Sequence, residues 1–142
     1  MITKNYKKFF LERQEKIYNR ALQQLEQGYI DTCIACFIFP YLRKLATNRK
    51  NFVFGIIDVE DAENYLAHPV LSARLIECCE MLLKHKNKDI KDMFSEIDVK
   101  RLQLSMTLFA LVSRGDSIFH KVLEVFYNGE KDPQTVEICK FY

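Results

Sequence analysis

The chain is poor in turn-forming residues: among its 142 residues there are four glycines and three prolines, and tryptophan is absent. A sheet protein with many tight turns usually needs more of both. Because 49% of the residues are hydrophobic and 28% are charged, the composition is that of a folded chain and excludes a disordered one. We therefore expect an all-α protein, a single compact domain over residues 1–142 with six to seven helices and room for one short hairpin.

Long hydrophobic segments are also lacking. The longest apolar run is Cys33–Tyr41, interrupted only by Pro40, and it is too short to cross a bilayer. We expect this run to be buried in protein or held against a ligand. The polar N-terminal residues do not resemble a secretory signal. The odd number of cysteines, five, predicts free thiols in a reducing cytoplasm. Delivery by a specialised secretion system would leave no mark in the sequence.

A strong overall charge is missing as well, since the net charge is +2. This small value argues against nucleic acid as a partner, and no segment predicts a membrane one. The charge is unevenly placed: residues 1–50 hold ten basic and four acidic residues, a net +6, which leaves −4 for residues 51–142. The favoured interpretation of the basic part is a solvated helix face; the alternatives are a face for an acidic partner or for the acidic remainder of the same domain.

Familiar catalytic and metal-binding motifs are absent: we find no glycine-rich phosphate loop, no His-Glu-x-x-His and no calcium loop. We therefore assign no catalytic residue, no metal ligand and no cofactor. Cys33-x-x-Cys36 has the spacing of a redox or metal motif, but it lies within the apolar run and lacks a second close pair. We therefore expect buried structural cysteines rather than a redox or metal motif.

Helical periodicity is clear in most of the chain. Residues 6–27 predict an amphipathic helix ended by Gly28, and the almost uniformly apolar stretch up to Val112 predicts a central helix. The break at His68-Pro69 predicts that one helix ends and another begins there. One stretch, residues 52–57, is strand-like and has no obvious strand partner.

Several short motifs, in this order, resemble the domain-of-unknown-function 1810 family, a group of small, mainly helical proteins. The matching segments cover most of the chain: Phe37-Ile38-Phe39-Pro40, Phe54-Gly55-Ile56, Ala62-x-x-Tyr65-Leu66-x-His68-Pro69-Val70-Leu71-x-x-Arg74-Leu75, Lys100-x-Leu102, Ser105-Met106-Thr107-Leu108-Phe109 and Asp132-Pro133-x-Thr135. The resemblance implies an all-helical single domain. It implies no established function.

The departures from the family pattern bear on function. In that pattern, the Phe-Ile-Phe-Pro segment is preceded by His-Trp-Met-Trp and followed by Gln, whereas this chain has Cys33-Ile34-Ala35-Cys36 and Tyr41. The missing imidazole, indoles and amide are groups suited to lining a ligand pocket. We therefore expect a scaffold that is kept while a small-molecule site is lost.

Six residues are candidate contacts for a ligand or partner: Phe39, Tyr41, His68, Arg74, Ser105 and Thr107. His68 is either a general base or the joint between two helices. Arg74 either binds a phosphate or carboxylate or forms a structural salt bridge. The hydroxyls of Ser105 and Thr107 either contribute to a site or bond back to the preceding helical turn.

Two functions are compatible with these features of the sequence. The first is a non-catalytic helical binding module that acts through a protein partner, with exposed aromatic residues as anchors: Phe9, Phe10, Tyr29, Tyr41, Phe141 and Tyr142. The alternative is an enzyme or sensor for a nucleotide-like, ADP-ribose-type small molecule, if His68, Arg74, Ser105 and Thr107 converge on one cavity. An enzyme is the less favoured of the two.

Overall fold

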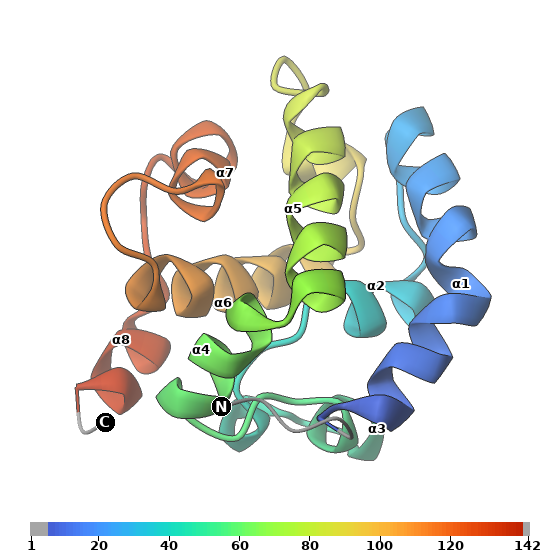
Figure 1. The fold of residues 1–142 in the computed structure, drawn as a ribbon. Coiled ribbons are helices and arrows are strands. Elements are labelled where there is room, and N and C mark those ends of the chain that lie inside the picture. The colour runs from blue at the N-terminus through green and yellow to red at the C-terminus, as the bar shows by residue number, and fades with distance from the viewer. Residues whose placement is uncertain (1–5, 141–142) are drawn as a thin grey trace.

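The structure, a computed structural model, describes residues 6–140, and Figure 1 shows their arrangement. Within these residues the chain forms eight α-helices and two short 3-10 helices, in the order α1 (Lys8–Gln27), α2 (Thr32–Ile38), η1 (Arg43–Leu45), α3 (Arg49–Val53), α4 (Val59–Ala67), α5 (Pro69–Leu83), η2 (Ile90–Asp92), α6 (Glu96–Val112), α7 (Ile118–Tyr127) and α8 (Pro133–Cys139). The prediction of an all-α fold is confirmed. No helix of residues 6–140 has both the length and the apolarity needed to span a membrane.

The helix boundaries follow local capping signals. The side chain of Asp58 accepts a hydrogen bond from the third residue of α4, and Ser95 does the same for α6. At the other end of α1, Gly28 adopts φ 91°, and its N–H bonds to the Leu25 carbonyl at 3.0 Å. This left-handed conformation is costly for residues with a Cβ, so glycine ends the helix as the sequence predicts.

The central position of α6 is confirmed. It packs against α4, α7 and α8, and it runs roughly across the direction of α5 (Figure 1). Met106, Leu108 and Phe109 on this helix are fully buried. The Phe109 ring lies 5.5 Å from the rings of both Tyr65 and Phe119, so one aromatic side chain joins α4, α6 and α7 in the core.

The strand expected at residues 52–57 is wrong, because α3 occupies the start of this stretch. Asn48 caps α3 by accepting a hydrogen bond from the Asn51 N–H at 2.8 Å, which favours a helical turn. After the helix, the only β-type pairing in residues 6–140 is one parallel bridge between Leu42 and Ile56. It places residues 41–43 beside the Phe54-Gly55-Ile56 motif.

Gly55 is required by this close approach. A Cβ at this position would lie 2.7 Å from the Arg43 Cα, which is shorter than any ordinary contact. The Ile56 N–H donates to the Tyr41 carbonyl at 2.8 Å, and the Arg43 N–H donates to the Ile56 carbonyl at 2.9 Å. The family motif therefore holds the backbone around Tyr41 in place.

Candidate functional site

A small hollow lies beside the Phe-Ile-Phe-Pro segment, between α2, α3 and α6. Its volume is about 10 Å³, roughly the space needed for one water molecule. The lining residues come from four stretches of the chain: Ala35, Cys36, Phe39, Tyr41, Asn51, Phe94, Asp98, Arg101 and Leu102. Two of the predicted site residues, Phe39 and Tyr41, therefore share this hollow.

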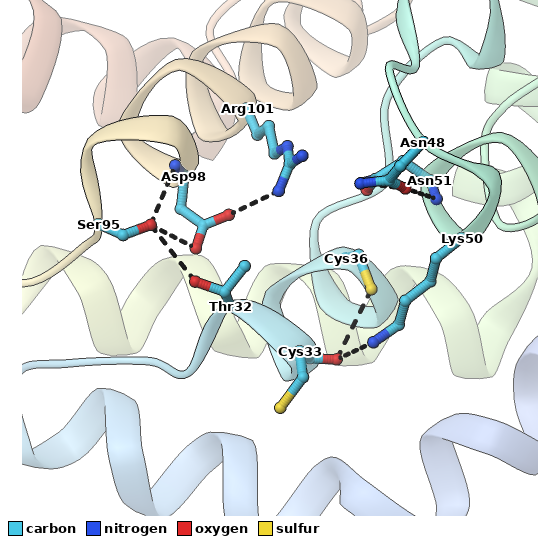
Figure 2. A network of polar contacts seen from close by, with 9 residues as sticks. All are labelled: Thr32, Cys33, Cys36, Asn48, Lys50, Asn51, Ser95, Asp98 and Arg101. Atoms are coloured by element: carbon cyan, nitrogen blue, oxygen red, sulfur yellow. Dashed lines mark hydrogen bonds and ion pairs between the residues drawn. The ribbon is translucent and has the colours of Figure 1, made fainter.

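An ion pair on α6 forms the polar wall of the hollow. The Asp98 carboxylate is 2% exposed; it accepts a hydrogen bond from the Ser95 hydroxyl at 2.8 Å and lies 3.5 Å from the Arg101 guanidinium. Figure 2 shows the Arg101 side chain extending from α6 into the space between Asp98 and Asn51. The helical repeat places Asp98 and Arg101 one turn apart on the same side of α6.

The two ionisable groups on the opposite wall are kept neutral. Burial raises the pKa of the Cys36 thiol, although Lys50 acts in the opposite direction. Burial also raises the pKa of the Tyr41 phenol, and this effect exceeds the opposing influence of Arg101. Since the thiolate is the reactive form of cysteine, Cys36 is a poor nucleophile at neutral pH.

Cys33 and Cys36 differ in exposure, because Cys33 is exposed and Cys36 is buried. Their sulfur atoms point in different directions from α2 (Figure 2). Among residues 6–140, no group of three or more His, Cys, Asp or Glu side chains is arranged to hold a metal ion. The expectation of a buried structural cysteine therefore holds for Cys36 and is wrong for Cys33, which lies at the exposed start of α2.

His68 acts as the joint between α4 and α5. Its Nδ1 accepts hydrogen bonds from the N–H groups of Val70 and Leu71, both at 3.2 Å. Pro69 is the first residue of α5, where its missing N–H is not needed. His68 is not among the residues that line the hollow beside Phe39.

Arg74 joins α5 to α1. Its guanidinium donates to the Gln14 side-chain oxygen at 3.2 Å, forms an ion pair with Glu15 and lies 5.2 Å from the centre of the Tyr18 ring. Gln14 is itself buried and donates to the Phe37 carbonyl at 2.6 Å. Arg74 thus supports α2 indirectly, through Gln14.

Thr107 belongs to a buried network between α6 and α8. Its hydroxyl oxygen accepts a hydrogen bond from the Asp132 N–H at 2.9 Å, and the Asp132 carboxylate accepts from Lys100 and from Thr135. Burial alone would raise the pKa of Asp132, but the bonds from Lys100 and Thr135 outweigh it and hold this pKa below its usual range. One structural network therefore explains four residues that match the family motifs: Lys100, Thr107, Asp132 and Thr135.

Ser105 is fully buried, and its hydroxyl has no hydrogen-bond partner within residues 6–140. Like His68, Arg74 and Thr107, it does not line the hollow beside Phe39. Three polar residues that do line it were not predicted from the sequence: Asn51, Asp98 and Arg101. Asp98 and Arg101 could have been found from the spacing Ser95-x-x-Asp98-x-x-Arg101. This spacing combines a residue that caps a helix with an acidic and a basic residue one helical turn apart.

Residues 4–139 match the sequence profile described as "Protein of unknown function (DUF1810)". The chain belongs to the DUF1810 family. This DUF1810 protein is also similar to the crystal structure of the conserved hypothetical protein Rv1873 from Mycobacterium tuberculosis, with a TM-score of 0.91, 30% sequence identity, and coverage of 95% of this chain and 97% of that chain. No significant match is found among curated proteins. The resemblance inferred from the short motifs is confirmed.

Proposed function

We propose that this DUF1810 protein is a non-catalytic binding module that acts through a protein partner in a reducing cytoplasm. The main support is the size of the hollow beside Phe39, about 10 Å³. Ligand pockets for drug-sized molecules usually measure about 300–1,000 Å³. A nucleotide does not fit such a space without a large rearrangement of α2.

The residues of the α2 segment explain this small size. Ala35, Cys36 and Tyr41 line the hollow, and they occupy positions where the family pattern has Met, Trp and Gln. Tyr41 is 4% exposed and packs its ring into the protein. The scaffold of the family is thus retained while the hollow is lined by a small residue, a neutral thiol and a buried phenol.

The surface supplies anchors of the kind found at protein interfaces. Of the six aromatic residues predicted to be exposed, Phe9 and Tyr29 are exposed, whereas Phe10 and Tyr41 are buried. Phe10 faces the core because it lies one position along α1 from Phe9, and its ring contacts Phe54 and Tyr65. Phe141 and Tyr142 lie outside the described residues.

The alternative is an enzyme or sensor for a nucleotide-like, ADP-ribose-type small molecule. One observation favours it: Arg101 is largely buried beside the hollow, and its single hydrogen bond within residues 6–140 is the long one to Asp98. A guanidinium with unused donors is suited to a phosphate or carboxylate.

A thermal-shift screen separates these two functions. A ligand that binds only the folded state stabilises it by about 2.7 kcal/mol at a concentration one hundred times its Kd. We expect no change of Tm with millimolar nucleotides, ADP-ribose included. A rise of Tm that disappears in Arg101→Gln, in a variant that still folds, would favour the small-molecule function.

The protein partner is tested by affinity capture from the cells that make the protein, followed by binding of the purified candidate. We expect one non-chaperone protein to form a defined complex with the purified chain. If only chaperones are recovered and the chain remains a monomer, the binding-module proposal fails.

A further inference from the structure

The N-terminal half of α1 adjoins the segment η1–α3, and the side chains that the two expose there are called the α1–α3 face. It comprises the side chains Phe9, Arg13, Lys16, Arg43, Lys50, Phe52 and Val53. The two segments meet where the Phe9 ring stacks on the Phe54 ring, with 5.2 Å between centres and 16° between planes. In Figure 1 the dark-blue start of α1 lies next to α3.

Apolar side chains remain exposed on this face. Phe9 is 57% exposed, Phe52 is 50% exposed and Val53 is 45% exposed. These exposed groups come from two different elements of the fold and are joined through the buried Phe54. Exposed large apolar residues that gather in one region are a feature of interaction surfaces.

Three cations of this face lie over aromatic rings, namely the exposed Phe9 and Phe52 and the buried Phe37. The Arg13 guanidinium lies 6.0 Å from the Phe9 ring centre and 5.8 Å from the Phe37 ring centre, and Lys50 Nζ lies 4.6 Å from the Phe37 ring centre. Arg43 lies 4.8 Å from the Phe52 ring centre. These cation–π contacts hold the positive charges close to the exposed apolar groups.

Two carboxylates, Glu12 and Glu15, lie beside Phe9 and Arg13, but both pair with cations outside this face. Glu12 pairs with Lys8 on one side of α1, and Glu15 pairs with Arg74 of α5. Within residues 6–140, no ion pair involves the cations of the face, namely Arg13, Lys16, Arg43 and Lys50. The buried Arg43 Nε also lacks a hydrogen-bond acceptor in this part of the chain.

We infer that the α1–α3 face binds an acidic segment of a protein partner that also carries aromatic or aliphatic side chains. This inference rests on the proposed function and names its surface. The partner's carboxylates pair with the cations of the face, while its apolar side chains cover Phe9, Phe52 and Val53. A phosphate backbone is less suited, because it brings no apolar groups to cover the exposed Phe52 and Val53.

The test uses the full chain and a fluorescein-labelled synthetic peptide that repeats Glu-Asp-Phe-Leu. Fluorescence anisotropy measures binding to the wild type, to the charge-reversal variant Arg13→Glu/Lys50→Glu, and to the matched control Lys121→Glu/Lys131→Glu. Both control residues are exposed and lie outside this face. We expect the reversal to weaken binding at least about tenfold, because it replaces attraction between the face and the peptide by repulsion. The control should bind the peptide as the wild type does, since its two charges lie outside the face.

Lys50 also donates to the Cys33 carbonyl at 2.8 Å, so its replacement could disturb α2. A second variant, Phe52→Ser, removes the exposed ring without touching that bond, and circular dichroism checks the folding of every variant. Equal weakening by reversal and control, or unchanged binding to Phe52→Ser, overturns the inference. Tighter binding of an oligothymidylate than of the acidic peptide also overturns it.

Affinity capture separates this inference from the proposed function. If the partner of the wild type is recovered equally well with Arg13→Glu/Lys50→Glu, the binding module stands and the α1–α3 face is wrong. If the wild type itself captures no partner, the proposed function fails. Loss of the partner with the reversal variant, and its retention by the control variant, supports both.

Discussion

The hydroxyl of Thr107 on α6 accepts a hydrogen bond from the main-chain N–H of Asp132, which caps α8, at 2.9 Å. Both groups are buried. A side chain in the middle of the central helix thereby fixes the start of the last helix. This bond gives both Thr107 and the Asp132-Pro133-x-Thr135 motif a structural role.

Thr107→Val tests this relationship. The substitution keeps the shape of the side chain and leaves the Asp132 N–H buried without an acceptor, which costs about 1–3 kcal/mol. Urea unfolding should show this loss of free energy. Thr107→Ser keeps the hydroxyl and serves as the control. If Thr107→Val unfolds at the same urea concentration as the wild type, the bond does not support α8.

Acid should weaken the fold through two carboxyl groups. For Asp61, burial alone would raise the pKa, but the bonds from Tyr6 and Ile57, together with the charge and bond of Lys7, outweigh it and lower the pKa. The pKa of Asp132 is lowered as well. Around these pKa values the unfolded chain therefore binds more protons than the folded one. The stabilisation from the two carboxylates is complete above their pKa in the unfolded chain, about 3.9, and is lost as the pH falls through their lower pKa values in the folded protein.

The measurement is the free energy of unfolding in urea from neutral pH downward. We expect a plateau at neutral pH and a decline below about pH 5. Asp132→Asn should show a smaller decline than the wild type, since it removes one of the two groups. The prediction is contradicted if the free energy of unfolding of the wild type stays constant at pH values below the ordinary pKa of a carboxyl group.

His68→Ala should destabilise the fold by about 1 kcal/mol, because it removes the acceptor for the first N–H groups of α5. His68→Asn provides the control, since asparagine also caps helices. Thermal unfolding measures both. A His68→Ala protein of unchanged stability would show that the imidazole is not needed at the helix joint.

The thiols should react at different rates in the native protein. Cys33 is exposed, whereas Cys78 and Cys79 are buried, and burial raises the pKa of Cys78 to about 12. A chromogenic disulfide reagent should therefore label Cys33 rapidly and the two adjacent cysteines only on unfolding. Cys33→Ser should remove the fast phase. Rapid labelling of both Cys33 and Cys36 would contradict the packing role assigned to Cys36.

Much of the fold could be predicted from local patterns. Gly28 marks the end of one helix and His68-Pro69 the break between two others, and the structure confirms both. Residues 52–57 could not be predicted in this way, because the apolar run there covers the end of a short helix and a single bridge. The contact that requires Gly55 comes from Arg43, twelve residues earlier.

The candidate site was only half visible in the sequence. Phe39 and Tyr41 stand out because they belong to the longest apolar run, and both line the hollow. Asn51 and Arg101 have no distinctive sequence context. They meet Tyr41 only because the bridge at Ile56 and the packing of α6 bring three separate segments together.

By itself, the sequence determined the helical class, most helix ends and the family, because periodicity, caps and short motifs are local properties of the chain. Tertiary structure decided the rest. It directed His68, Arg74 and Thr107 into bonds with other parts of the protein, and it brought Phe9 and the cations of α3 onto one surface. Which groups remain exposed depends on contacts between residues far apart in the chain, and such contacts exist only after folding.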